Sequence, residues 1–273
     1  MNTRNSFKEF SWSCCLSGLA ALLLVLAGCG GSGKDATRAE TTAPEAAPKA
    51  EAASGYVVHE APGGNIAGRV LLNGKPLAPR AVVVNQDAAV CGKQREIYPV
   101  RLAKGGIVDA VVWIDGIQQG KPFAFPEAKL DQKGCAYSPH IVLMQPGELK
   151  IGSQDPVPHN VHTYSQSNRE YNESMNQLRR NVTLRLVRPE RVSMRCDLHG
   201  WMQAYVVVAA DPYYAISRES GAFELTDVPP GRYHLRAWQE SLGELSQDVV
   251  VEAGKTAKVD FTFDSESAQA GSK

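Results

Sequence analysis

Apolar and polar residues alternate along most of the chain between residues 64 and 263, and Gly, Pro and Asn separate the runs. A period of two places alternate side chains on one face, which is typical of half-buried strands. The pattern predicts an all-β chain of β-sandwiches, and only residues 171–180, whose apolar spacing is poor, are considered for a short helix. The expected strands are 65–72, 81–85, 108–114, 141–144, 149–153, 181–187, 192–196, 204–208, 213–217, 222–225, 232–238, 245–251 and 257–263.

A long apolar run at residues 10–27 follows a weakly basic start and ends in Leu-Ala-Gly-Cys at 26–29. This arrangement is typical of a secretory signal, and an uncleaved membrane anchor is the alternative. The last four residues resemble the lipobox of bacterial lipoproteins. That resemblance implies removal of residues 1–28, a lipid anchor in the bilayer on Cys29, and a location in the cell envelope. In such lipoproteins an Asp after the lipidated Cys is a signal for retention in the inner membrane. This chain has Gly30 there, which favours an anchor in the outer membrane, with the protein facing the periplasm or the cell surface.

The remaining chain divides by composition. Residues 29–61 are rich in Gly, Ala, Pro, Thr, Glu and Lys, and such a segment buries too little apolar surface to order itself. We expect a disordered tether there, an elaborated first domain at 62–210, a smaller sandwich at 211–264 and a tail at 265–273. The formal net charge is zero, which argues against a nucleic-acid partner.

Metal-binding residue types gather in two segments. His159 lies in Pro-His-Asn-Val-His at 158–162, and Cys196, His199 and Met202 share one short loop with two residues between successive members. A thiolate, two imidazoles and a thioether are the ligands of a blue-copper electron-transfer site. Three ligands on one loop and a fourth from a neighbouring strand can converge on one ion. His162 is either an alternative ligand or, the reading we favour, a residue behind the ligands or at the surface.

The two segments and the Val-rich strand after Met202 resemble the cupredoxins, above all amicyanin-type and plastocyanin-type proteins, over about residues 131–210. The resemblance implies a Greek-key β-sandwich and one type 1 copper ion held by His159, Cys196, His199 and Met202. It also implies that Asn160 braces the ligand loop by hydrogen bonds. The imidazole of His199 would be the exposed ligand, so that electrons would pass at the surface around His199, Gly200 and Trp201. Such a protein exchanges single electrons with redox protein partners and is not an enzyme.

Other functions are considered for the same residues. Structural zinc sites rarely use Met, and a Cys196–His199 nucleophile for acyl transfer would need both side chains on one tight loop. A copper carrier or store, or an adhesive sandwich with an incidental metal site, is the alternative to an electron carrier. The stretch 165–180 is an insertion relative to a minimal cupredoxin; we expect a solvated loop that could also cover the site or contact a partner.

The C-terminal region, 213–263, contains alternating strands around Val-Pro-Pro-Gly at 228–231. It resembles the carboxypeptidase regulatory-like domain, a transthyretin-like sandwich whose usual role is structural or adhesive. Residues 62–130 form either a separate module or the first strands of the cupredoxin-like domain. We favour the second, because Val-Val-Trp-Ile at 111–114 reads as core.

The six cysteines divide by compartment. The lipobox resemblance implies that two leave with the signal segment and that Cys29 carries lipid, and the cupredoxin resemblance implies that Cys196 binds copper. Cys91 and Cys135 remain as an even pair in an oxidising compartment, which predicts a disulfide between them.

Overall fold

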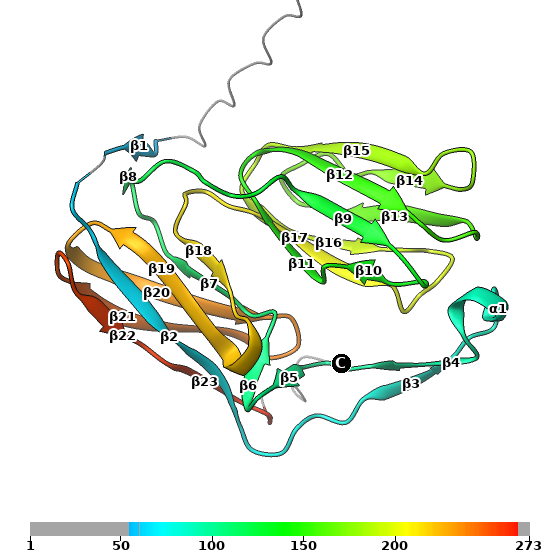
Figure 1. The fold of residues 1–273 in the computed structure, drawn as a ribbon, viewed down its shortest axis with the longest axis horizontal. Helices are drawn as coiled ribbons and strands as arrows, with labels where there is room; N and C mark the ends of the chain where they lie inside the picture. The colour runs from blue at the N-terminus through cyan, green and yellow to red at the C-terminus, as the bar shows by residue number, and fades with distance from the viewer. Residues whose placement is uncertain (1–54, 60, 267–273) are drawn as a thin grey trace, which may run out of the picture. The chain divides into compact units, whose positions relative to one another are not determined.

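The computed structural model describes residues 55–59 and 61–266, and these residues are nearly all β (Figure 1). They form two β-sandwiches, each made of two sheets around its own apolar core. The all-β class and the β-sandwich architecture expected from the alternating pattern are therefore confirmed.

The first sandwich pairs a four-stranded sheet, in the order β10-β9-β12-β15, with a five-stranded sheet, in the order β11-β17-β16-β13-β14. Alternation explains its core: in β12, Leu149 and Ile151 point inward while the residues between and beside them are more exposed. The strands are Lys129–Gln132 (β9), Tyr137–Ser138 (β10), Ile141–Met144 (β11), Gly147–Ser153 (β12), His159–Tyr164 (β13), Asn172–Met175 (β14), Asn181–Leu186 (β15), Glu190–Arg195 (β16) and Gln203–Val208 (β17).

The second sandwich pairs a sheet in the order β18-β7-β20-β21 with a sheet in the order β19-β2-β22, in which β23 also pairs with β2. Its core contains large side chains such as Tyr213, Phe261 and Phe263, all at most 1% exposed. The strands are Gly64–Asn73 (β2), Val111–Ile114 (β7), Tyr214–Ile216 (β18), Ala222–Val228 (β19), Gly231–Gln239 (β20), Gly243–Val251 (β21), Thr256–Lys258 (β22) and Phe261–Asp264 (β23).

Shorter elements complete the described chain. A hairpin that we call the arm, residues 80–97, leaves the end of β2 and carries a four-residue helix at its turn. The other elements form the parallel pair β1–β8, the hairpin β5–β6 and a 3-10 turn. Their bounds are Val57–Val58 (β1), Arg80–Val83 (β3), Ala88–Cys91 (α1), Gln94–Ile97 (β4), Arg101–Ala103 (β5), Gly106–Val108 (β6), Gln119–Gly120 (β8) and Glu219–Gly221 (η1).

The structure differs from the expected division of the chain. We expected residues 62–130 to join the cupredoxin-like domain, but β2 pairs with β19 and β7 lies between β18 and β20. These N-terminal strands therefore belong to the second sandwich. Residues 171–180 contain no helix; Asn172–Met175 is instead the edge strand β14, whose Met175 lies opposite His159.

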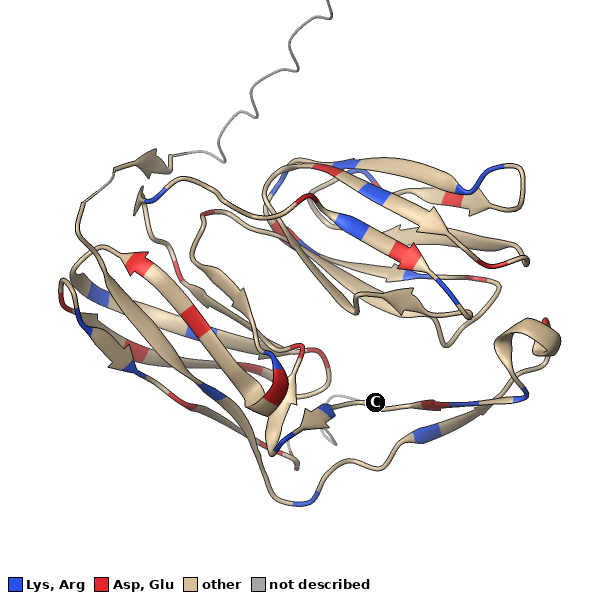
Figure 2. Cartoon of the chain, viewed as in Figure 1, with Lys and Arg blue, Asp and Glu red and all other residues tan. Residues whose placement is uncertain are grey.

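Several expectations concern residues outside the described part of the chain. The signal segment, the lipid site at Cys29 and most of the tether and tail lie there. Among the residues described, no helix has the length and apolar character needed to cross a bilayer. Lys, Arg, Asp and Glu are interspersed along the strands of both sandwiches (Figure 2), in keeping with the neutral overall charge.

Candidate metal centre

Two neighbouring antiparallel strands bring the expected ligands together. β13 begins with His159, and β16 ends at Arg195, immediately before Cys196. His162 lies opposite Arg195, so the start of β13 and the end of β16 meet at one end of the five-stranded sheet. The loop 196–202 then turns back into β17.

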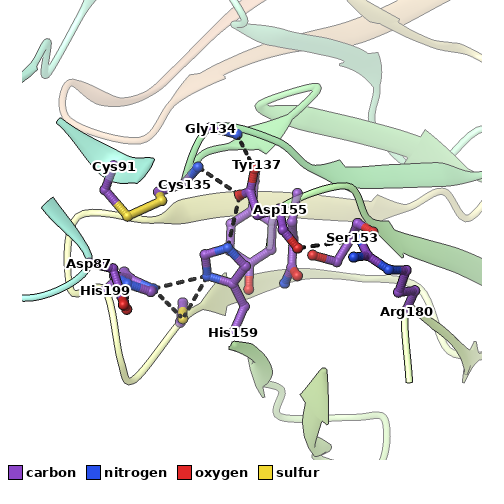
Figure 3. Close-up of polar contacts among 12 residues, drawn as sticks. Asp87, Cys91, Gly134, Cys135, Tyr137, Ser153, Asp155, His159, Arg180 and His199 are labelled. Atoms are coloured by element: carbon purple, nitrogen blue, oxygen red, sulfur yellow. Dashed lines mark hydrogen bonds and ion pairs between the residues drawn. A yellow bond between two sulfur atoms is a disulfide. The ribbon is translucent and has the colours of Figure 1, made fainter. Parts of the chain in front are cut away.

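Three donor atoms converge at that end (Figure 3). Nδ1 of His159 lies 2.9 Å from Nδ1 of His199. Sγ of Cys196 lies 3.9 Å from Nδ1 of His159 and 3.7 Å from Nδ1 of His199. The residues are 1%, 2% and 0% exposed for His159, Cys196 and His199, so the cluster is closed to solvent.

Met202, the fourth expected ligand, is 1% exposed and closes the same loop. Its N–H donates to the carbonyl of His199 at 2.8 Å, and its carbonyl accepts from the N–H of Cys196 at 3.2 Å. These two backbone hydrogen bonds fix the loop that carries three of the four expected ligands.

Each histidine has a carboxylate on the ring nitrogen that faces away from the cluster. Nε2 of His159 lies 2.9 Å from Oδ2 of Asp155, and Nε2 of His199 lies 3.1 Å from Oδ2 of Asp87. Metal-binding histidines commonly donate their second ring N–H to a carboxylate, which fixes the tautomer and the ring orientation. With both Nε2–H groups so engaged, both Nδ1 atoms present lone pairs to the cluster.

The electrostatics favour a neutral imidazole and an ionised Asp155. Burial lowers the pKa of His159, against the opposing effect of Asp155. Burial raises the pKa of Asp155, but hydrogen bonds from the Cys135 N–H, from His159 and from the Gly134 N–H lower it by more than burial raises it, so the net shift is downward. A neutral His159 is the form that can bind a metal.

Cys196 is the one free cysteine among the described residues. Burial raises the pKa of its thiol, while hydrogen bonds from the backbone N–H groups of Asn160, His199 and Leu198 lower it. The net shift is upward, because burial outweighs these hydrogen bonds; the thiolate is the form that binds metals.

Asn160 braces the ligand loop, as the resemblance implies. Its Oδ1 accepts from the Asp197 N–H at 2.7 Å, and its Nδ2 donates to Asp197 Oδ2 at 2.7 Å. His162 lies outside the donor cluster, with Nδ1 3.0 Å from Asp197 Oδ1 and its side chain 27% exposed. Of the two readings for His162, the structure therefore supports the residue behind the ligands.

We expected His199 to be the exposed ligand, and this expectation is wrong. Its side chain is 0% exposed, because Asp87 at the turn of the arm contacts it. Part of the insertion 165–180 extends the sheet as β14, and its Met175 lies opposite His159. Trp201 stays half-buried, with its ring centroid 5.1 Å from that of His199.

Cys91 and Cys135 form a disulfide that ties the arm to the first sandwich. Trp201 Nε1 donates to the carbonyl of Cys135 at 3.0 Å, so the loop 196–202 also contacts the Cys135 end of the disulfide. Potential ligand atoms of Cys91, Cys135 and His199 lie within 4.8 Å of one another, which places the disulfide beside the site.

Two carboxylates that contact His159 and His199 were not predicted from the sequence. Asp155 lies four residues before His159, just after β12, and that proximity is a signal that could have been used. Asp87 lies more than 70 residues before the first ligand, and no local pattern connects it to the site.

A family model described as "Polysaccharide lyase family 4, domain II" matches residues 198–259, where we expected a carboxypeptidase regulatory-like domain. No curated protein sequence matches the chain.

Similar solved structures include three copper proteins. A purple cupredoxin from Nitrosopumilus maritimus is 17% identical over 30% of this chain and 100% of its own, with a TM-score of 0.27. A mutant amicyanin is 18% identical over 32% and 85%, with a TM-score of 0.28. A Cu-containing nitrite reductase from Thermus scotoductus SA-01 is 11% identical over 33% of this chain and only 24% of its own, with a TM-score of 0.28. At such low similarity, the function must be argued from the donor atoms themselves.

Proposed function

We propose that this chain binds one copper ion in a type 1 site and transfers single electrons between redox protein partners. His159, Cys196 and His199 would hold the ion, and Met202 would be the weak axial ligand. The observation that carries the proposal is the convergence of two imidazole Nδ1 atoms and one thiol sulfur, 2.9–3.9 Å apart.

The donor set fits a metal ion on physical grounds. Both Nε2 atoms face carboxylates, so the two Nδ1 atoms direct lone pairs at each other across 2.9 Å. Such an arrangement is repulsive in a buried place unless a proton or a cation is shared. Donors lying about 2.0–2.3 Å from a common ion are separated by distances of this size.

Ligand softness favours copper. Thiolate and thioether sulfur suit copper, and two imidazoles with one thiolate and a weak Met form the blue-copper set. When bound, the ion supplies a one-electron couple. The chain's own part is to hold His159 and His199 by carboxylates and the loop by the hydrogen bonds of Asn160 and Met202. A scaffold fixed in this way keeps reorganisation between oxidation states small.

Burial supports an electron carrier over a copper carrier. The three donor residues are at most 2% exposed, so a chelator or a receiving protein cannot reach the ion without movement of the chain. The same burial leaves little room for a substrate, and we propose no catalytic role.

The test is the spectrum and metal content of the copper-loaded protein. We expect an intense visible thiolate-to-copper band and a narrow parallel hyperfine splitting, both absent from Cys196→Ser. A Cys196→Ser protein that keeps the band, or a wild-type protein that retains zinc in preference to copper, would refute the assignment.

Met202 is tested separately. Met202→Leu should keep copper and change the reduction potential, whereas Met144→Leu, a buried Met in β11 of the same core, should leave the potential unchanged. Loss of all copper binding in Met202→Leu would contradict an axial role.

We also propose that the protein is anchored in the cell envelope by lipid on Cys29, on the support of the lipobox-like sequence alone. Mass spectrometry of the N-terminal peptide tests this, and an unmodified Cys29 or a retained leader would contradict it. For the second sandwich we propose a structural or adhesive role; the family model that matches residues 198–259 is a polysaccharide lyase domain and not the carboxypeptidase regulatory-like domain that we expected.

A further inference from the structure

The arm approaches the ligand loop from a distant part of the sequence and is fastened to it at several points. Val84 and Cys91 are buried in the core of the first sandwich, and Cys91 is bonded to Cys135. The side-chain amide of Gln86 donates to the carbonyl of Leu198, next to His199. The turn of the arm is therefore held over the ligand loop by packing, a covalent bond and a hydrogen bond.

Asp87 occupies an unusual position in this turn. Its carbonyl accepts from the N–H groups of Val90 and Cys91 at 2.9 and 2.8 Å, and Asp87 is the N-cap residue of α1. An Asp at this position usually caps the helix with its side chain, but Asp87 makes no such bond. Its φ of 55° is also a conformation that few residues other than Gly adopt. The carboxylate is directed instead to Nε2 of His199, at 3.1 Å (Figure 3).

We propose that Asp87 is a positioning residue for the copper site, delivered by an arm that closes over His199. This proposal rests on the proposed function. By accepting the Nε2–H of His199, Asp87 fixes the tautomer that leaves Nδ1 free for the ion, and it prevents rotation of the ring. Its negative charge makes the imidazole a stronger donor. The effect is larger for the more highly charged Cu(II) than for Cu(I).

The same contact changes access to the site. His199 is 0% exposed while the Asp87 side chain is 31% exposed, so the arm and not the imidazole forms the outer surface here. A redox partner approaching from this side meets the arm first. Copper cannot leave past His199 unless the arm moves.

The experiment compares Asp87→Ala and Asp87→Asn in the full chain with Asp248→Asn. The last is a matched control, because Asp248 pairs with His234 in a His–carboxylate contact on the surface of the second sandwich. We expect Asp87→Ala to weaken Cu(II) binding about 10-fold and to release copper faster to a chelator. A tenfold loss confined to Cu(II) raises the reduction potential by about 59 mV. Asp87→Asn keeps an acceptor without the charge and should recover part of each effect.

A metal-free readout separates this proposal from the proposed function. In the apo-protein, the Nε2–H proton of His199 should be visible by NMR and slow to exchange, and Asp87→Ala should abolish that signal. If the wild-type protein binds no copper, the proposed function fails, and this proposal fails with it. If it binds copper but Asp87→Ala matches wild type in potential, chelator exchange and NMR, only the positioning role is overturned. Circular dichroism confirms that each variant folds.

Discussion

The Cys91–Cys135 disulfide joins two residues that are 44 positions apart, and both are buried in the core of the first sandwich. A cross-link lowers the conformational entropy of the unfolded chain more than it changes the folded state. For a loop of this length the chain-entropy relation gives a stabilisation of about 4 kcal/mol at 25 °C. Reduction of the bond should therefore lower the free energy of unfolding by about that amount.

The assay is urea unfolding of the copper-free protein, followed by far-UV circular dichroism and by tryptophan fluorescence. Coincident curves from both probes are needed before a single free energy is extracted, because two sandwiches can unfold separately. Chemical reduction removes the cross-link and keeps the sulfur atoms, whereas Cys91→Ala with Cys135→Ala also removes buried side-chain volume. We expect the double variant to lose about 1–2 kcal/mol more than the reduced protein.

The control is Cys196→Ala, which removes the one free thiol within residues 61–266 and with it the exchange of that thiol with the disulfide during unfolding. A loss below about 1 kcal/mol on reduction would mean that the unfolded chain keeps the two ends of the loop together, and the entropic reasoning would be refuted.

Three further predictions concern stability. Burial raises the pKa of Asp211 to about 7, so the neutral carboxyl group stabilises the fold fully below about pH 4, and this stabilisation is lost as the pH rises through 7. In urea titrations, Asp211→Asn should therefore be more stable than wild type by about 1–4 kcal/mol at pH 8 and equally stable at pH 4. Burial raises the pKa of Glu190, but hydrogen bonds from the loop 165–168 outweigh burial and lower this pKa to about 2. Glu190→Gln should therefore lower the free energy of unfolding by about 1–3 kcal/mol at pH 7, and this loss should shrink as the pH falls from 4.5 towards 2. An equal loss at pH 7 and at pH 2 would contradict the link between the pKa and stability. Leu149→Ala, at a residue 0% exposed, should cost about 2–5 kcal/mol in thermal or urea unfolding, whereas Leu178→Ala, at a residue 99% exposed, should change stability by less than about 0.5 kcal/mol.

Local patterns predicted many of the strands, though not β13, and they singled out His159, Cys196 and His199, whose potential ligand atoms lie within 4.8 Å of one another. A period of two is a property of each strand by itself, so 141–144 and 204–208 match β11 and β17 within one residue. The spacing of Cys196, His199 and Met202 keeps three expected ligands on one loop, and the loop geometry follows from the two strands around it. His159 was placed after a strand, whereas it is the first residue of β13.

Partnership between distant segments could not be predicted in the same way. The residues of Val111–Ile114 are all buried, so their apolar character fits a core strand of either sandwich equally well. Their pairing with β18 and β20 depends on strands that follow about 100 residues later. The contact of Asp87 with His199 has the same origin, because the arm's destination is set by its disulfide and its buried side chains rather than by its own sequence pattern.

The chain alternates between the two sandwiches, and this path has a consequence for biosynthesis. β2 is made early but pairs with β19, Gly68 lying opposite Phe223, after the whole of the first sandwich has been made. At about 5–20 residues per second, β2 waits on the order of ten seconds or longer for its partner. During that interval its unpaired edge and apolar face are open to other chains, a known route to aggregation. The N-terminal strands are therefore where delayed folding or chaperone protection would matter most, while β9–β17 of the first sandwich follow one another without interruption.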